Sequence, residues 1–161
     1  MPATHPIVVV GYDGTPAARA AVSRGIERVS NGGHLVVAQT YQVAADPHST
    51  SYGESLEDAA DEAARSLDRL AADDVRFDSV DWERSIHEGE PASTLCRVAA
   101  EHGADELIIG TRGRDRVGVF LGSVASGVLH LADRPVTVIP RRMLSRAGHT
   151  PEQGGLQAVI S

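Results

Sequence analysis

The chain has 161 residues, a mass of 17.0 kDa and a net charge of −7, with an isoelectric point near 5.4. Because a surface of that sign repels a phosphate backbone, nucleic acid is not expected as a general partner. No apolar run approaches the ~18 residues that a membrane-spanning helix needs, and no signal peptide is visible at the N-terminus. The single cysteine, Cys96, can form no internal disulfide. We therefore expect a cytoplasmic protein without membrane contact.

The first part of the chain predicts two strands with a helix between them. Ile7–Tyr12 is a mainly β-branched run, typical of a strand that is buried on both faces. Thr15 can cap a helix and Pro16 can open it, and apolar residues then recur at helical spacing as far as Val29. Two glycines end that helix, and Leu35–Ala38 predicts the second strand.

The middle of the chain predicts a loop, a helix and a third strand. Residues 41–53 contain Asp, Pro, His, Ser, Thr and Gly without periodicity, so we expect a mobile loop there. From Leu56 to Leu70 apolar residues mark one face of a second helix. Trp82–His87 is expected as the third strand, and Pro91 opens a third helix after it.

The last elements complete an alternation of strands and helices. Glu106–Ile109 predicts a fourth strand, residues 123–132 a fourth helix, and Val136–Ile139 a fifth strand. This alternation predicts one α/β domain, with an open parallel five-stranded sheet and helices on both faces. The domain is expected over residues 1–140, and residues 141–161 are expected to form a C-terminal tail.

Two features follow predicted strands at the edge where ligands of parallel sheets gather. Asp13 comes directly after the first strand, and a glycine-rich loop from Gly110 to Ser123 follows the fourth. Three arginines and one aspartate give this loop a charge of +2, which leaves −9 for the rest of the chain. Glycines allow backbone N–H groups to approach an anion, and a helix N-terminus adds further donors. The loop therefore favours a phosphate site, although the spacing alone leaves plain turn chemistry open.

Several segments together resemble one known family. They are residues 8–14 (VVVGYDG), Gly89-x-Pro91, Gly110-Thr111-Arg112-Gly113, Leu121-Gly122-Ser123-Val124 and Arg134-Pro135-Val136-Thr137-Val138. In this order and spacing, over residues 6 to 140, they look like a universal stress protein of the nucleotide-binding branch. Eight residues separate Gly113 from Gly122, one fewer than is usual in that branch.

The resemblance implies a fold, a ligand and a set of site residues. The fold would be that of the adenine nucleotide α-hydrolases, with strand order 3-2-1-4-5 and ATP lying across strands one and four. Mg²⁺ would be held mainly by the phosphates of ATP. The implied nucleotide-binding residues are Gly11, Tyr12 and Asp13 near the ribose, Thr40 near the adenine, Ile109 and Gly110 beside base and sugar, and Arg112, Gly113, Gly122, Ser123 and Val124 near the phosphates.

The function implied is a regulatory, nucleotide-dependent switch in the stress response. A slow ATPase, a binder of cyclic AMP and a nucleotide-free interaction module of the same fold remain alternatives. A homodimer is also implied, in which Val136–Ile139 pairs with its twin as an edge strand. No catalytic residues and no metal ligands are nominated, since the histidines lack ligand spacing and Cys96 lies on the apolar face of a helix. Trp82 is expected to make a packing or interface contact.

Overall fold

Five parallel strands form one sheet in the order β3-β2-β1-β4-β5. The computed structural model describes residues 5–44, 46–111 and 121–140. The elements are β1 (Ile7–Gly11), α1 (Pro16–Val29), β2 (His34–Tyr41), α2 (Tyr52–Asp73), the 3-10 helix η1 (Val75–Ser79), β3 (Trp82–Glu88), α3 (Pro91–Glu101), β4 (Glu106–Gly110), α4 (Ser123–Leu131) and β5 (Val136–Ile139). The predicted fold class and strand order are confirmed.

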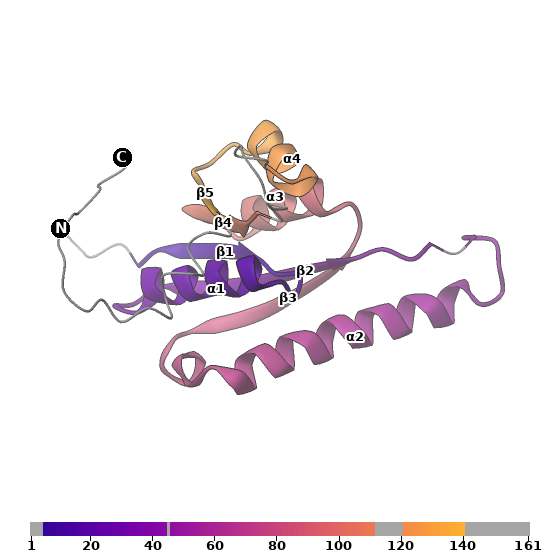
Figure 1. The fold of residues 1–161 in the computed structure, drawn as a ribbon, viewed down its shortest axis with the longest axis horizontal. Helices are drawn as coiled ribbons and strands as arrows, with labels where there is room; N and C mark the ends of the chain where they lie inside the picture. Colours follow the sequence, from indigo (N-terminus) through magenta and orange to yellow (C-terminus); the bar gives the residue numbers. More distant parts are fainter. Residues whose placement is uncertain (1–4, 45, 112–120, 141–161) are drawn as a thin grey trace, which may run out of the picture.

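The helices cover the sheet in two layers, as Figure 1 shows. Successive strand residues point to opposite faces, so the side chains of β1 belong to two hydrophobic clusters, one on each face of the sheet. Val8 and Val10 pack in a cluster with residues of α1 and α2, whereas Val9 packs in a second cluster with residues of α3 and α4. All three valines have no exposed surface. Burial on both faces explains why the strand is a continuous apolar run.

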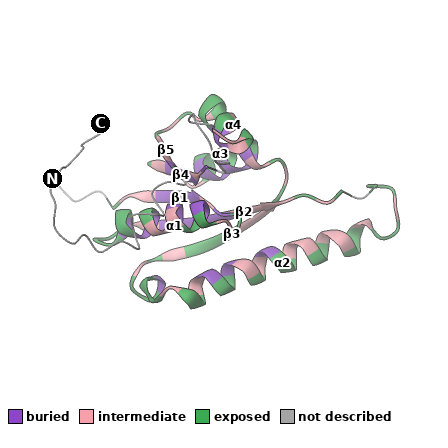
Figure 2. Cartoon of the chain, in the orientation of Figure 1, coloured by how far each residue is buried: buried purple, intermediate pink, exposed green. Residues whose placement is uncertain are grey.

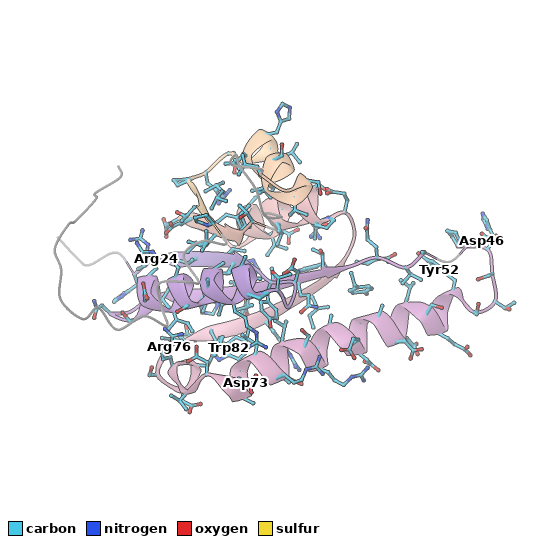
Figure 3. The ribbon with its side chains drawn as sticks, viewed as in Figure 1. Arg24, Asp46, Tyr52, Asp73, Arg76 and Trp82 are labelled. Atoms are coloured by element: carbon cyan, nitrogen blue, oxygen red, sulfur yellow. The ribbon has the colours of Figure 1, made fainter. Side chains whose placement is uncertain are left out.

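The second strand and the second helix are longer than the sequence predicts. The ladder between β2 and β3 continues to the pair Tyr41 and Glu88, and α2 already begins at Tyr52. The hydroxyl of Tyr52, a residue labelled in Figure 3, donates to Glu88 Oε1 at 2.9 Å. This hydrogen bond joins the start of α2 to the end of β3. The predicted loop over residues 41–53 was therefore wrong at both ends, because pairing with β3 and this tertiary contact extend the elements into it.

The chain between α2 and β3 contains an element that the sequence analysis did not predict. Asp74 caps η1 by accepting the N–H of Arg76 at 3.0 Å, and the hydrogen bond from the Arg76 side chain lowers the pKa of Asp74. Phe77 is buried and its ring lies 4.6 Å from that of Trp82, tilted by 59°. Trp82, labelled in Figure 3, thus makes the packing contact expected of it.

Burial is uneven along the longest helix. The fully buried residues of α2 are Ala63, Leu67 and Leu70, all in its C-terminal half, and Figure 2 shows the other half as exposed or half-buried. No helix among residues 5–44, 46–111 and 121–140 combines the length and the apolar character needed to cross a membrane. The predicted tail, residues 141–161, lies outside the described residues.

Candidate nucleotide site at the carboxyl edge of the sheet

A cavity of about 330 Å³ opens at the carboxyl ends of β1, β2 and β4. The connection from β1 leads to α1 on one face of the sheet, whereas α4, which follows β4 in the chain, lies on the other face. Such a reversal separates neighbouring connections and leaves a crevice between them. The residues that line the cavity are Gly11, Tyr12, Asp13, Thr15, Ala18, Ala38, Thr40, Gln42, Pro91, Leu95, Ile109, Gly110, Gly122, Ser123, Val124 and Ala125.

The structure brings together nine of the eleven residues predicted for the site. Gly11, Tyr12, Asp13, Thr40, Ile109, Gly110, Gly122, Ser123 and Val124 all line the cavity. Arg112 and Gly113 lie outside the described residues. The sequence analysis missed Gln42, Pro91 and Leu95 among others. Pro91 carried a usable signal, because it starts a helix just after a predicted strand end, whereas the apolar wall follows only from tertiary packing.

The N-terminus of α1 forms one wall of the cavity. The Thr15 hydroxyl accepts the N–H of Ala18 at 3.2 Å and so caps the helix. The same hydroxyl donates to Asp13 Oδ1 at 2.6 Å, and the Thr15 N–H donates to that oxygen at 3.0 Å. Asp13 is therefore joined by two hydrogen bonds to the residue that caps α1.

The N-terminus of α3 contributes Pro91 and Leu95 to the wall. The side chain of the preceding residue, Glu90, accepts hydrogen bonds from N–H groups at this helix start. Glu90 accepts the N–H of Ser93 at 2.8 Å and that of Ala92 at 3.0 Å. These backbone hydrogen bonds, that from Ser93 first, lower the pKa of the Glu90 carboxyl. A carboxylate already occupies the donors at this helix start.

The N-terminus of α4 is arranged differently. Its N-cap is Gly122, with φ −59° and ψ 164°, and no side-chain hydrogen bond caps the helix within the described residues. Gly122, Ser123, Val124 and Ala125 all line the cavity. The first N–H groups of a helix carry a partial positive charge and need acceptors. This helix start is therefore suited to an anion.

Three buried apolar side chains also line the cavity. Ala38 lies in β2, Ile109 in β4, and Leu95 on α3. Thr40 and Gln42 add polar groups on the β2 side. An apolar wall with few polar groups is typical of a site for a flat heterocycle.

Two further predicted residues have a structural role. A Cβ at Gly110 would lie 2.6 Å from the backbone carbon of Ala17, so a glycine is required where β4 passes the first turn of α1. Tyr12 is 4% exposed, and its ring belongs to the core between α1, α2 and the sheet. Burial is the main cause that raises the pKa of its phenol, and its N–H donates to the carbonyl of Ala38 at 2.8 Å.

Cys96 and the histidines of the described residues are not among the residues that line the cavity. Cys96 is half-buried beside the core of α3 and α4, and burial raises the pKa of its thiol, which disfavours the reactive thiolate. His34 and His102 face Asp81 and Glu83 at the opposite edge of the sheet. Within the part of the chain that the structure describes, no three His, Cys, Asp or Glu side chains could hold a metal ion together.

Comparison with known proteins agrees with this architecture. The sequence profile of the universal stress protein family matches residues 5–140. The chain belongs to the universal stress protein family. The strand order expected from that resemblance is the one the structure has.

Individual universal stress proteins cover most of the chain. One from Mycolicibacterium smegmatis is 32% identical over 141 aligned residues, and the match covers 84% of this chain and 46% of the relative. One from Thermus aquaticus is 28% identical over 135 aligned residues, and the match covers 82% of this chain and 96% of the relative. The chain thus spans about half the length of the M. smegmatis protein and nearly all of the T. aquaticus protein.

A solved universal stress protein in complex with cAMP is also similar. It is 26% identical with a TM-score of 0.55, and the match covers 83% of this chain and 95% of the other.

Proposed function

We propose that this universal stress protein binds an adenine nucleotide, ATP with Mg²⁺, in the cavity at the carboxyl edge of the sheet. The observation that carries the proposal is the composition of the cavity wall. The wall includes the N-terminus of α4, which begins at Gly122 without a side-chain cap in the described residues. It also includes the buried apolar side chains of Ala38, Leu95 and Ile109. A helix N-terminus suits phosphates, and an apolar surface suits a base.

The predicted residues take definite places in this proposal. Asp13 would accept ribose hydroxyls, and Thr40 would lie beside the base. The phosphates would bind to N–H groups at the start of α4 and to the segment that contains Arg112 and Gly113. Mg²⁺ would bind mainly to phosphate oxygens, as is usual for this ion with nucleotides.

Cyclic AMP is a second candidate ligand, because the similar universal stress protein with 26% identity was solved in complex with cAMP. It shares the base and the ribose with ATP but has a single phosphate. We favour ATP because the loop from Gly110 to Ser123 has a charge of +2 in a chain of −7. A local positive charge favours the ligand with more negative charge.

We further propose that the nucleotide acts as a switch and that the protein is a homodimer through β5. Among the strands of the described residues, β5 pairs with β4 alone and forms an edge of the sheet. An edge strand has backbone donors and acceptors that a second copy can pair with. Val136, Thr137 and Val138 are half-buried rather than exposed. Antiparallel pairing with a twin would be two-fold symmetric and would close on itself.

The experiment for the ligand uses the purified chain. Mass spectrometry of the small molecules released on denaturation should find an adenine nucleotide. Thermal-shift titrations with Mg-ATP, cAMP and Mg-GTP should then show the largest rise of the melting temperature with Mg-ATP, since a ligand that binds only the folded state stabilises it. A flat response to all three up to millimolar concentration would contradict the proposed site, and a larger response to cAMP would replace ATP by the second candidate.

The experiment for the dimer is sedimentation at micromolar concentration. A single species of 17.0 kDa would contradict pairing through β5. A dimer that dissociates when Val138 is replaced by proline would support it, because proline cannot donate a hydrogen bond to a neighbouring strand.

A further inference from the structure

Every second residue at the end of β2 lines the cavity, and the last of them is Gln42. Ala38, Thr40 and Gln42 all belong to the wall. Successive residues of a strand point to opposite faces, and Ala38 packs in the cluster that includes residues of α3 and α4. The alternation therefore continues one residue beyond Tyr41, where β2 ends, and places the Gln42 side chain on the cavity side.

The backbone next to Gln42 is held by the neighbouring strand. Tyr41 is paired with Glu88 in the parallel ladder of β2 and β3, and its carbonyl accepts the N–H of Gly89 at 3.0 Å. Glu88 in turn accepts the hydroxyl of Tyr52 at 2.9 Å. The exposed side chain of Gln42 thus extends from a backbone position that tertiary contacts hold beside the cavity.

We propose that the Gln42 amide recognises the exocyclic amino group of the base, and so makes the cavity selective for adenine over purines that lack this group. The inference rests on the proposed nucleotide site, in which Thr40 lies beside the base. A primary amide has an acceptor oxygen and, next to it, an NH₂ group with two donors. Adenine presents an N6–H donor next to a ring-nitrogen acceptor, and glutamine amides pair with this pattern in nucleic acids.

Gln39 on the same strand is the matched control. By the alternation of β2 it lies on the opposite face, where Leu35 and Val37 pack in the cluster with residues of α1 and α2, and it is not among the residues that line the cavity. Its Oε1 is buried and has no hydrogen-bond partner among the described residues. An apolar residue at this position removes an unpaired buried acceptor and should leave recognition of the base unchanged.

The experiment uses calorimetry to measure the affinities of the full chain for Mg-ATP and for the Mg²⁺ complex of purine riboside triphosphate, which lacks only the 6-amino group. The parent should prefer ATP about fivefold, the scale of one hydrogen bond between uncharged groups. Gln42→Met keeps the length of the side chain without the amide, and should remove this preference. Gln42→Glu should bind both ligands more weakly but keep a preference for ATP, because its carboxylate still accepts the N6–H group. Gln39→Met should keep the full preference.

The remaining outcomes overturn the inference, and they separate it from the proposed function. If the parent binds ATP without preferring it, or if Gln42→Met keeps the full preference, Gln42 does not recognise the amino group and the nucleotide site stands. Loss of the preference in Gln39→Met would also contradict the inference, because the effect would not belong to Gln42. If the parent binds neither ligand, the proposed function fails as well. Gln42→Ala is the second variant in case the methionine variant does not fold, and it should lose the preference in the same way.

Discussion

The N-termini of α3 and α4 lie on the same face of the sheet and both reach the cavity, yet their chemistry is opposite. Glu90 occupies two N–H groups at the start of α3, whereas α4 starts at Gly122 with no side-chain cap in the described residues. The two helices pack closely, since a Cβ at Gly127 would lie 2.7 Å from the Cβ of Ala92. The difference teaches that a helix start becomes a candidate anion site where the chain supplies no carboxylate of its own.

The largest expected effect comes from placing a carboxylate at the start of α4, which would remove its difference from α3. We expect Gly122→Asp to weaken ATP binding by about a hundredfold, because the new side chain would cap the helix and repel the phosphates. The φ and ψ of Gly122 are those of an ordinary N-cap, so the apoprotein should be slightly more stable, by a few tenths of a kcal/mol. Calorimetry measures the expected loss of affinity for ATP, and chemical denaturation measures the expected gain in stability.

Gly122→Asn is the matched control for this variant. Asparagine caps a helix about as well as aspartate but carries no charge. It should weaken ATP less than aspartate does, and the difference between the two variants measures the repulsion. Equal affinity of the parent and both variants would mean that the phosphates do not bind at α4.

The converse change removes the carboxylate from α3. Glu90→Ala should lower the free energy of unfolding by about 1 kcal/mol, the usual effect of losing an N-cap. Because Glu90 is exposed and does not line the cavity, the affinity for ATP should stay within about twofold of the parent. Urea denaturation and calorimetry on the same preparation test the pair of effects. A large loss of affinity would show that Glu90 itself contributes to nucleotide binding.

The smallest expected effect is on pH dependence. The pKa of Glu90 is lowered from 4.5 in the folded protein, so its charged form stabilises the fold above that value, and the contribution is lost as the pH falls through the lower folded pKa. The stability advantage of the parent over Glu90→Gln should therefore be constant near neutral pH and should shrink below about pH 4.5. Denaturation curves of both proteins between pH 3 and 7 measure it. An advantage that persists unchanged at pH 3 would contradict the capping contact.

The sequence by itself determined the local elements and their class. The valine run of β1, Thr15 and Pro16 at the start of α1, and Pro91 at the start of α3 act through backbone preferences and burial that a few neighbouring residues decide. Asp13 and Gly110 could be assigned to the carboxyl edge because each follows directly on a strand. The strand order came from the resemblance to the family and is confirmed by the structure.

Only the tertiary structure decided which apolar side chains line the cavity and which helix start has N–H groups without a side-chain cap among the described residues. The apolar wall of Ala38 and Leu95 joins residues from β2 and α3, far apart in the sequence, because the two elements pack against each other. The extension of β2 to Tyr41 depends on its pairing with β3. Glu90 occupies the donors of α3 through side-chain geometry that spacing does not reveal. Such contacts depend on how distant segments meet, and no short window of sequence specifies that meeting.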